Sequence, residues 1–309
     1  MHRSVFVAGV GYFELTVNGK RVGAGRKFDV GWTEYAKRVF YVNFNLTSFL
    51  NVGENVVGVE LGNSWYQENG WYQQPPYMGC NTKAQPGRHG QGSGTCNGGG
   101  FSYPNANQLL LKANIKLMNG SVMSLHTDGG GDWLSAAGPI TFDSLYDGEH
   151  YDARLEQPGW NSVVGYNPSV GGWIAAQAVA PTDNVMSKAV LSSQPYEPIR
   201  VVAEETPHAS WTWNGSYIFD YGRNMVGVVR LRISNPVAGA TVTLRHAEVK
   251  MHPPYGEADG SLYYGSLRNV HATDKYYLHF MNTWLVISKM TGVSTYDSNM
   301  FLNSDRNII

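Results

Sequence analysis

The stretch Leu61-Gly62-Asn63-Ser64-Trp65-Tyr66 ends an apolar segment, residues 56–61, that has the composition of a buried β-strand. An amide and two large aromatic rings therefore leave the predicted sheet together at one strand end. The flat C–H faces of a sugar pack on such rings while its hydroxyls bond an amide, so the stretch indicates carbohydrate recognition. A Trp-Tyr pair in an all-β domain also serves as core or rim packing, and both interpretations stay open at this point.

The residues upstream of this stretch alternate with the period of two that a half-buried strand requires. Apolar Phe13, Leu15 and Val17 are separated by polar side chains. Asn18-Gly19 follows, and two residues that tolerate positive φ predict a type I′ hairpin with a returning strand. Asn119-Gly120 is a second hairpin signal.

Composition describes a β-rich, turn-rich protein with room for two domains. The chain has 309 residues, of which 36 are Gly and 13% are aromatic, and helical periodicity is nearly absent. The formal net charge is -1 and the basic residues are scattered, which argues against nucleic acid and anionic membranes as partners. No apolar run is long enough to cross a bilayer. The sequence does not determine the oligomeric state.

The first residues and the cysteines bear on the compartment. Met1-His2-Arg3-Ser4 leads into strand-like sequence without a secretory signal, which predicts a cytoplasmic location or secretion through an N-terminus that lies upstream. Cys80 and Cys96 bracket a loop rich in Gly, Gln, Pro and Ser. A disulfide there would stabilise the loop by about 3 kcal/mol, and two free thiols are the equal alternative. A zinc site is not expected, since only His89 lies between the cysteines.

Six short motifs follow one another in a specific order and spacing. They are VNGKRVG (17–23), GWTEY (31–35), GENVVGV (53–59), LGNSWY (61–66), GPITF (138–142) and YDGEHYDAR (146–154). Together they resemble the N-terminal domain of family 78 α-L-rhamnosidases. Strand-rich segments between residues 199 and 276 resemble the second β-sandwich of the same family.

The resemblance implies a division of the chain into four parts. Residues 1–178 form an N-terminal β-sandwich that binds carbohydrate, 179–195 a linker, 196–280 a partial second β-sandwich and 281–309 an unrelated tail. The predicted fold is all-β, with two jelly-roll-like β-sandwich domains, the second incomplete, and without the catalytic helical barrel of the family.

Catalysis by this chain alone is not expected. Glycoside hydrolysis needs two carboxylates held across a sugar, and in the family these lie in the barrel. The chain offers three acidic pairs, which we expect in turns or on solvated surfaces: Asp147 with Glu149, Asp152 with Glu156, and Glu204 with Glu205. No residue is therefore predicted to be catalytic.

Some family members carry an L-rhamnose-binding β-sandwich that uses calcium, and the resemblance implies both ligands here. Calcium takes carboxylate and amide oxygens and accepts vicinal sugar hydroxyls as further ligands. The predicted metal ligands are Asp29, Asn63 and Asn105. The predicted carbohydrate-binding residues are Trp32, Trp65, Tyr66, Asp29 and Asn63. A simple turn-forming role is the alternative for Asp29.

Three functional hypotheses follow. The first is a non-catalytic, lectin-like module, or a truncated α-L-rhamnosidase-like protein, that binds L-rhamnose or rhamnose-containing glycans. The second is the N-terminal part of an active α-L-rhamnosidase that hydrolyses terminal α-L-rhamnosides. The third is a structural fragment without activity.

Overall fold

The computed structural model describes residues 3–66, 107–127, 132–179, 188–233, 236–267 and 270–279, and the backbone of 284–287 and 299–304. Strands dominate these residues, with two short 3₁₀ turns, η2 (Ala153–Leu155) and η4 (Gly265–Leu267). The predicted all-β fold is confirmed. Within these ranges no helix has the length and hydropathy that a membrane crossing requires. Cys80, Cys96 and Asn105 lie outside the described residues.

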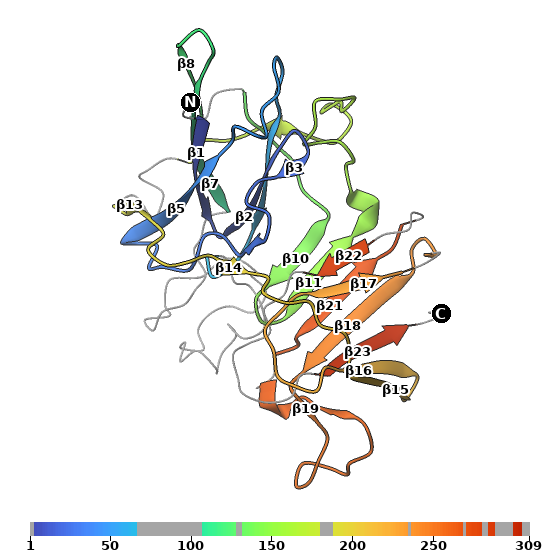
Figure 1. Cartoon of the computed structure of the whole chain (residues 1–309). Helices are drawn as coiled ribbons and strands as arrows, with labels where there is room; N and C mark the ends of the chain where they lie inside the picture. The colour runs from blue at the N-terminus through green and yellow to red at the C-terminus, as the bar shows by residue number, and fades with distance from the viewer. Residues whose placement is uncertain are drawn as a thin grey trace, which may run out of the picture.

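The first domain is a sandwich of a five-stranded and a three-stranded sheet (Figure 1). The larger sheet has the order β13 (Val190–Ser193), β5 (Arg38–Asn45), β1 (Arg3–Val10), β7 (Gln108–Lys116) and β8 (Val122–His126). The smaller sheet has the order β3 (Lys20–Arg21), β2 (Tyr12–Val17) and β6 (Val57–Gly62).

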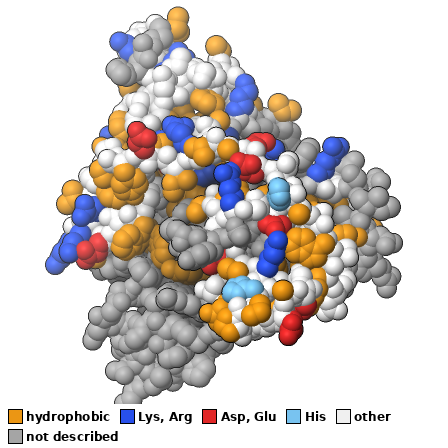
Figure 2. All heavy atoms as spheres, turned by 60° about the horizontal axis from the view of Figure 1, so that its bottom comes forward, with side chains coloured by type: hydrophobic (Ala, Val, Ile, Leu, Met, Phe, Trp, Pro, Cys, Tyr) orange, Lys and Arg blue, Asp and Glu red, His pale blue; other side chains and the backbone are white. Residues whose placement is uncertain are grey.

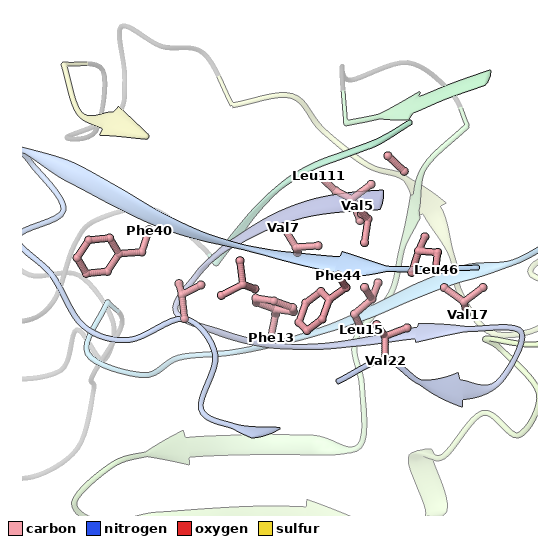
Figure 3. Packing of buried hydrophobic residues seen from close by; sticks show 13 residues of the cluster. Val5, Val7, Phe13, Leu15, Val17, Val22, Phe40, Phe44, Leu46 and Leu111 are labelled. Carbon is pink, nitrogen blue, oxygen red and sulfur yellow. The ribbon is translucent and has the colours of Figure 1, made fainter. Parts of the chain in front are cut away.

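The core of this domain lies between the two sheets, where every second side chain of each strand points inward. Figure 3 shows Phe13, Leu15 and Val17 of β2 facing Val5 and Val7 of β1, and all five are buried. Burying one such aliphatic side chain stabilises the fold by about 1.5–3 kcal/mol. The alternation in the sequence therefore predicts the buried face of β2 correctly.

The chain passes from one sheet of the sandwich to the other at Gly11, between β1 and β2. Gly11 has a φ of 106°, a conformation that residues with a Cβ rarely adopt. A Cβ at Gly11 would also lie 2.2 Å from the carbonyl oxygen of Gly62. Only glycine allows β6 to approach this bend so closely.

The hairpin predicted at Asn18-Gly19 is confirmed, because β2 pairs with β3 and both turn residues have positive φ, 52° and 75°. The Asn18 amide also organises a neighbouring loop. Its nitrogen donates to the Phe49 carbonyl at 2.9 Å and to Asn55 Oδ1 at 2.8 Å, and its oxygen accepts from the Val56 N–H at 2.9 Å.

The second domain contains a seven-stranded sheet. Its order is β10 (Ile140–Ser144), β11 (Gly148–Asp152), β21 (Thr273–Tyr277), β18 (Thr241–Ala247), β23 (Asn299–Ser304), β16 (Ser216–Asp220) and β15 (Ala209–Trp213). Strand β17 (Val229–Arg232) pairs separately with β22 (Trp284–Ile287). A buried cluster including Val242, Leu244 and Tyr276 forms its core. Asn214-Gly215, with φ of 46° and 77°, turns β15 into β16.

Three two-stranded ladders complete the described strands. They are β9 (Leu134–Ser135) with β12 (Ile174–Ala175), β4 (Arg26–Lys27) with β14 (Ile199–Arg200), and β19 (Val249–Lys250) with β20 (Leu262–Tyr263).

The sheets divide the chain differently from the boundaries predicted from sequence. Strands β10 and β11 fall within 1–178, yet β11 pairs in parallel with β21 of the second domain. Figure 1 shows β10 and β11 beside the strands of that domain. Strand β13 falls within the predicted linker 179–195, yet it pairs in parallel with β5. Strands β22 and β23 fall within the predicted tail 281–309 and join second-domain strands. Strand pairing is a long-range contact that local alternation does not encode.

Basic and acidic side chains are interspersed on the face that Figure 2 shows. Exposed ion pairs in the second domain join Arg223 with Glu205 and Arg230 with Glu204. Exposed pairs of this kind contribute about 0–1 kcal/mol each, so the sheets and their cores carry the stability.

Replacing the Asn18 amide tests its role in the first domain. Asn18→Gly keeps the positive φ at no steric cost but removes three hydrogen bonds, so we expect the free energy of unfolding to fall by about 1–3 kcal/mol. Urea unfolding followed by tryptophan fluorescence measures this. The control is Asn214→Gly, an exposed turn residue of the same conformation, which should change stability by less than about 0.5 kcal/mol. Equal losses in both variants would contradict the assignment.

Candidate functional site

Three aromatic side chains gather where the two domains meet. The ring centroids of Trp32 and Trp65 lie 6.3 Å apart at 57°, and those of Trp65 and Tyr146 lie 5.6 Å apart at 81°. Trp32 is 52% exposed, while Trp65 and Tyr146 are partly buried. Two of the predicted platform residues, Trp32 and Trp65, are therefore brought together. We call the set Trp32, Trp65 and Tyr146 the aromatic edge.

Tyr146 is part of the aromatic edge, although the sequence did not single it out as a binding residue. It lies in the turn between β10 and β11, about eighty positions after Trp65. The six-motif resemblance included this turn, but only strand pairing across the domains brings its ring to Trp65.

The loop that carries Trp32 is fixed by a segment far away in sequence. The Gly31 N–H donates to Gln194 Oε1 at 3.1 Å, and Tyr196 donates to the carbonyl of Trp32 at 3.5 Å. A Cβ at Gly31 would lie 1.8 Å from the Tyr196 hydroxyl, so the close approach requires glycine. The indole of Trp32 is thus held at the surface by its backbone.

Tyr66 differs from the prediction, because it is fully buried. Its ring packs edge-to-face on Tyr35 at 5.1 Å, in a small cluster with Ala8, Val10 and Val39. A buried ring offers no face to a sugar. The packing interpretation, which the sequence left open for the Trp-Tyr pair, therefore holds for Tyr66.

Asn63, directly after β6, uses its backbone and side chain in hydrogen bonds within the fold. Its backbone N–H donates to Asp143 Oδ2 at 2.7 Å, and its side-chain nitrogen donates to the Asp143 carbonyl at 2.8 Å. Its side-chain oxygen accepts from Asn107 at 3.1 Å. We call the pair Asn63 and Asp143 the interdomain clamp, because it joins β6 of the first domain to β10 of the second sheet. Asn63 positions the neighbouring Trp65 instead of presenting a free amide.

Asp29 is paired with Arg26. Arg26 Nε lies 2.5 Å from Asp29 Oδ2 and its Nη2 lies 2.7 Å from Oδ1, with the Asp29 side chain only 8% exposed. The Asp29 carbonyl also accepts the Phe13 N–H at 2.8 Å. Both carboxylate oxygens are used, so the structural role fits Asp29 better than a ligand role.

The predicted calcium ligands do not fit that ion in the described part of the chain. The carboxylate of Asp29 is neutralised by Arg26, most donors and acceptors of Asn63 are used, and Asn105 lies outside the described residues. Among the described residues, no group of three His, Cys, Asp or Glu has the arrangement of a metal site. Calcium binding stays a prediction, and nothing below depends on it.

Buried carboxylates lie next to the interdomain clamp. Burial, together with the charges of Asp143 and Asp274, raises the pKa of Glu149 to about 8. Tyr276 donates to Glu149 Oε1 at 3.2 Å, which partly opposes this shift. Burial also raises the pKa of Asp143, against the hydrogen bond from the Asn63 N–H. Glu149 therefore favours the protonated state near neutral pH. The sequence singled out Glu149 only as a member of an acidic pair, and Asp143 not at all.

The three acidic pairs considered for hydrolysis have structural partners. Asp147 is buried and accepts the His271 N–H at 2.9 Å. Asp152 binds Arg154 at 2.7 and 2.6 Å. The remaining contacts join Glu149 with Tyr276, Glu156 with Tyr151, Glu204 with Arg230, and Glu205 with Arg223. Each pair is accounted for by folding contacts, and the aromatic edge is the better candidate site.

Two family models match the chain. Residues 2–203 match the alpha-L-rhamnosidase N-terminal domain, and residues 211–291 match the bacterial alpha-L-rhamnosidase concanavalin-like domain. The second match ends inside the segment predicted to be an unrelated tail.

Curated relatives carry the same name over a longer chain. An alpha-L-rhamnosidase of Streptomyces avermitilis is 33% identical over 277 residues, which are 89% of this chain and 23% of that protein. One of Formosa agariphila is 31% identical over 235 residues, or 74% of this chain and 21% of that protein. The chain thus spans less than a quarter of the length of these two relatives.

Solved structures show the same relationship. The alpha-L-rhamnosidase of Dictyoglumus thermophilum aligns with a TM-score of 0.76 at 26% identity, covering 100% of this chain and 29% of that one. The Streptomyces avermitilis alpha-L-rhamnosidase, solved in complex with L-rhamnose, aligns with a TM-score of 0.74 at 30% identity, covering 97% and 25%.

The raised pKa of Glu149 predicts that the fold weakens as the pH rises from about 4.5 to about 8. The group has a pKa of about 8 when folded against 4.5 in its ordinary state, so its contribution is fully present below pH 4.5 and is lost as the pH rises through 8. The free energy of unfolding should fall over this range by up to about 1.4 kcal/mol per pH unit.

The Glu149→Gln variant isolates this effect. An amide cannot ionise, so we expect a flatter stability profile and a higher melting temperature than that of the native chain at pH 8.5. Glu54→Gln, at an exposed loop position, is the control and should follow the native profile. Parallel curves for the native chain and Glu149→Gln between pH 5 and 9 would refute the buried, protonated state.

Proposed function

The chain belongs to the α-L-rhamnosidase family, and we propose that it recognises L-rhamnose, or the terminal rhamnose of a glycan, on the aromatic edge. The observation that carries this proposal is the half-exposed indole of Trp32, held 6.3 Å from Trp65 at an angle of 57°. The complex of the Streptomyces avermitilis relative with L-rhamnose supports the choice of sugar. The resulting activity is binding without bond cleavage.

The chemistry of the sugar suits such a surface. L-rhamnose is a 6-deoxy sugar, so one face of its ring carries C–H groups and a methyl group that pack on an aromatic ring. The exposed indole of Trp32 packs on this face of the sugar and leaves its hydroxyls to water. Few polar groups fix the ligand, so we expect a dissociation constant of about 1 mM, equivalent to about 4 kcal/mol.

The mechanism is recognition by a preformed surface. The backbone contacts of Gly31 and Trp32 position the loop that carries the Trp32 indole. The interdomain clamp positions the segment that carries the Trp65 indole, because Asn63 lies two residues before it. Little side-chain freedom is then lost when the sugar binds, which favours affinity. Within a longer enzyme, this part of the chain would hold a rhamnose-bearing substrate near other domains.

A second candidate is the N-terminal part of an active enzyme that hydrolyses terminal α-L-rhamnosides. It is favoured by the relatives, which carry that name and are between four and five times as long as the matched region. The two candidates differ in what this chain does alone. Release of an aryl group from an aryl α-L-rhamnoside by the purified 309-residue chain would contradict a purely binding role.

Calorimetric titration of the purified chain with L-rhamnose tests the proposal directly. Trp32→Ala should weaken binding roughly three- to tenfold, because an aromatic contact contributes about 0.5–1.5 kcal/mol beyond its buried area. Tyr255→Ala, which removes an aromatic ring that is 57% exposed in the second domain, is the matched control and should leave affinity unchanged. Repeating the titration after chelation tests the predicted calcium dependence separately.

The outcomes are distinct. Binding that is lost in Trp32→Ala and kept in Tyr255→Ala supports the aromatic edge. Equal binding by the native chain and both variants would mean that the sugar binds elsewhere. No heat of binding from folded native protein would favour a structural fragment.

A further inference from the structure

A hollow of about 470 Å³ lies on the face of the five-stranded sheet that points away from the core. Phe6 of β1 and Leu110 of β7 alternate with the core residues Val5, Val7 and Leu111, and they are 38% and 44% exposed. The volume is within the range of about 300–1,000 Å³ that small-molecule sites have. The lining residues used below are Phe6, Ala8, Tyr41, Leu110, Lys112 and His126.

The hollow arises from one small side chain among large ones. Ala8 pairs with Leu110 across β1 and β7, and its methyl group is too small to fill the space between the larger neighbouring side chains. Tyr41 of β5 and Phe6 stand beside it with their rings edge-to-face at 5.8 Å. The hollow is therefore bordered by the aromatic and aliphatic side chains Phe6, Tyr41 and Leu110, with Ala8 at its base.

The polar groups of the hollow are basic or neutral. Lys112 pairs in register with Phe6 on one side and with His126 on the other, so the three form one row across β1, β7 and β8. No Asp or Glu is among the residues lining the hollow in the described part of the chain. Lys112 therefore lines a largely apolar surface, with no carboxylate among the lining residues that the structure describes.

We propose that this hollow binds a flat, apolar molecule that carries one anionic group, of the chemical class of aromatic carboxylates. The ring system packs against Phe6, Tyr41 and Leu110, which gains the free energy of burying apolar area. The carboxylate accepts a charge-assisted hydrogen bond from Lys112. A neutral sugar suits the hollow poorly, because its hydroxyls would lose water against aliphatic side chains. The site is therefore separate in chemistry from the aromatic edge.

Two fluorescent probes that share a ring system test the proposal on the full chain. 1-Anilinonaphthalene-8-sulfonate is flat, apolar and anionic, and N-phenyl-1-naphthylamine lacks its sulfonate. We expect saturable binding of the anionic probe with one site per chain. Lys112→Gln should weaken binding of the anionic probe about two- to fivefold, as for loss of an exposed ion pair, and leave binding of the neutral probe unchanged.

A second variant removes the apolar wall. Leu110→Ser should weaken the binding of both probes. Because Leu110 is exposed, the substitution should leave the fold intact, and far-ultraviolet circular dichroism checks this. Lys116→Gln removes a charge from the same strand outside the hollow and should change neither affinity. The proposal is overturned if Lys112→Gln leaves the anionic probe unchanged, if Lys116→Gln weakens it equally, or if Leu110→Ser affects neither probe.

Discussion

The hydrogen bonds between Asn63 and Asp143 are the constraint on which the arrangement of this chain depends. They join the end of β6 to β10, eighty residues later, through a backbone N–H and a side-chain amide. Because they are partly buried, these bonds are costly to leave unmade, and they hold the end of β6 against β10. Trp65 follows Asn63 by two residues and Tyr146 follows Asp143 by three, so one clamp places both rings.

The two domains share strands instead of meeting at a simple linker. Residues 140–152 join the second sheet, and β13 then returns to the first sheet beside β5. This exchange means that neither sheet is complete without chain segments from both halves of the sequence. It also explains why the aromatic edge lies at the junction, where loops of the first domain meet the β10–β11 turn.

The acidic and aromatic side chains of the described residues lie in contrasting environments. Carboxylates that the sequence offered in pairs are held by Arg, Tyr and backbone groups, and Glu149 is kept mostly protonated by burial. Aromatic rings, in contrast, are presented at the surface in two different settings. At the aromatic edge they stand with polar neighbours and suit a sugar, whereas in the hollow of the five-stranded sheet they stand with aliphatic groups and one lysine and suit an apolar anion.

The sequence by itself determined the elements whose cause is local. Alternation at Phe13, Leu15 and Val17 identified a buried strand face, and Asn18-Gly19 specified its turn because only such residues adopt two successive positive φ angles readily. The ordered motifs also identified the family. Tertiary structure alone decided that Tyr66 is buried on Tyr35 and that Tyr146 meets Trp65. Side-chain exposure and strand partners depend on contacts between segments far apart in the chain, and neither periodicity nor spacing along the sequence contains that information.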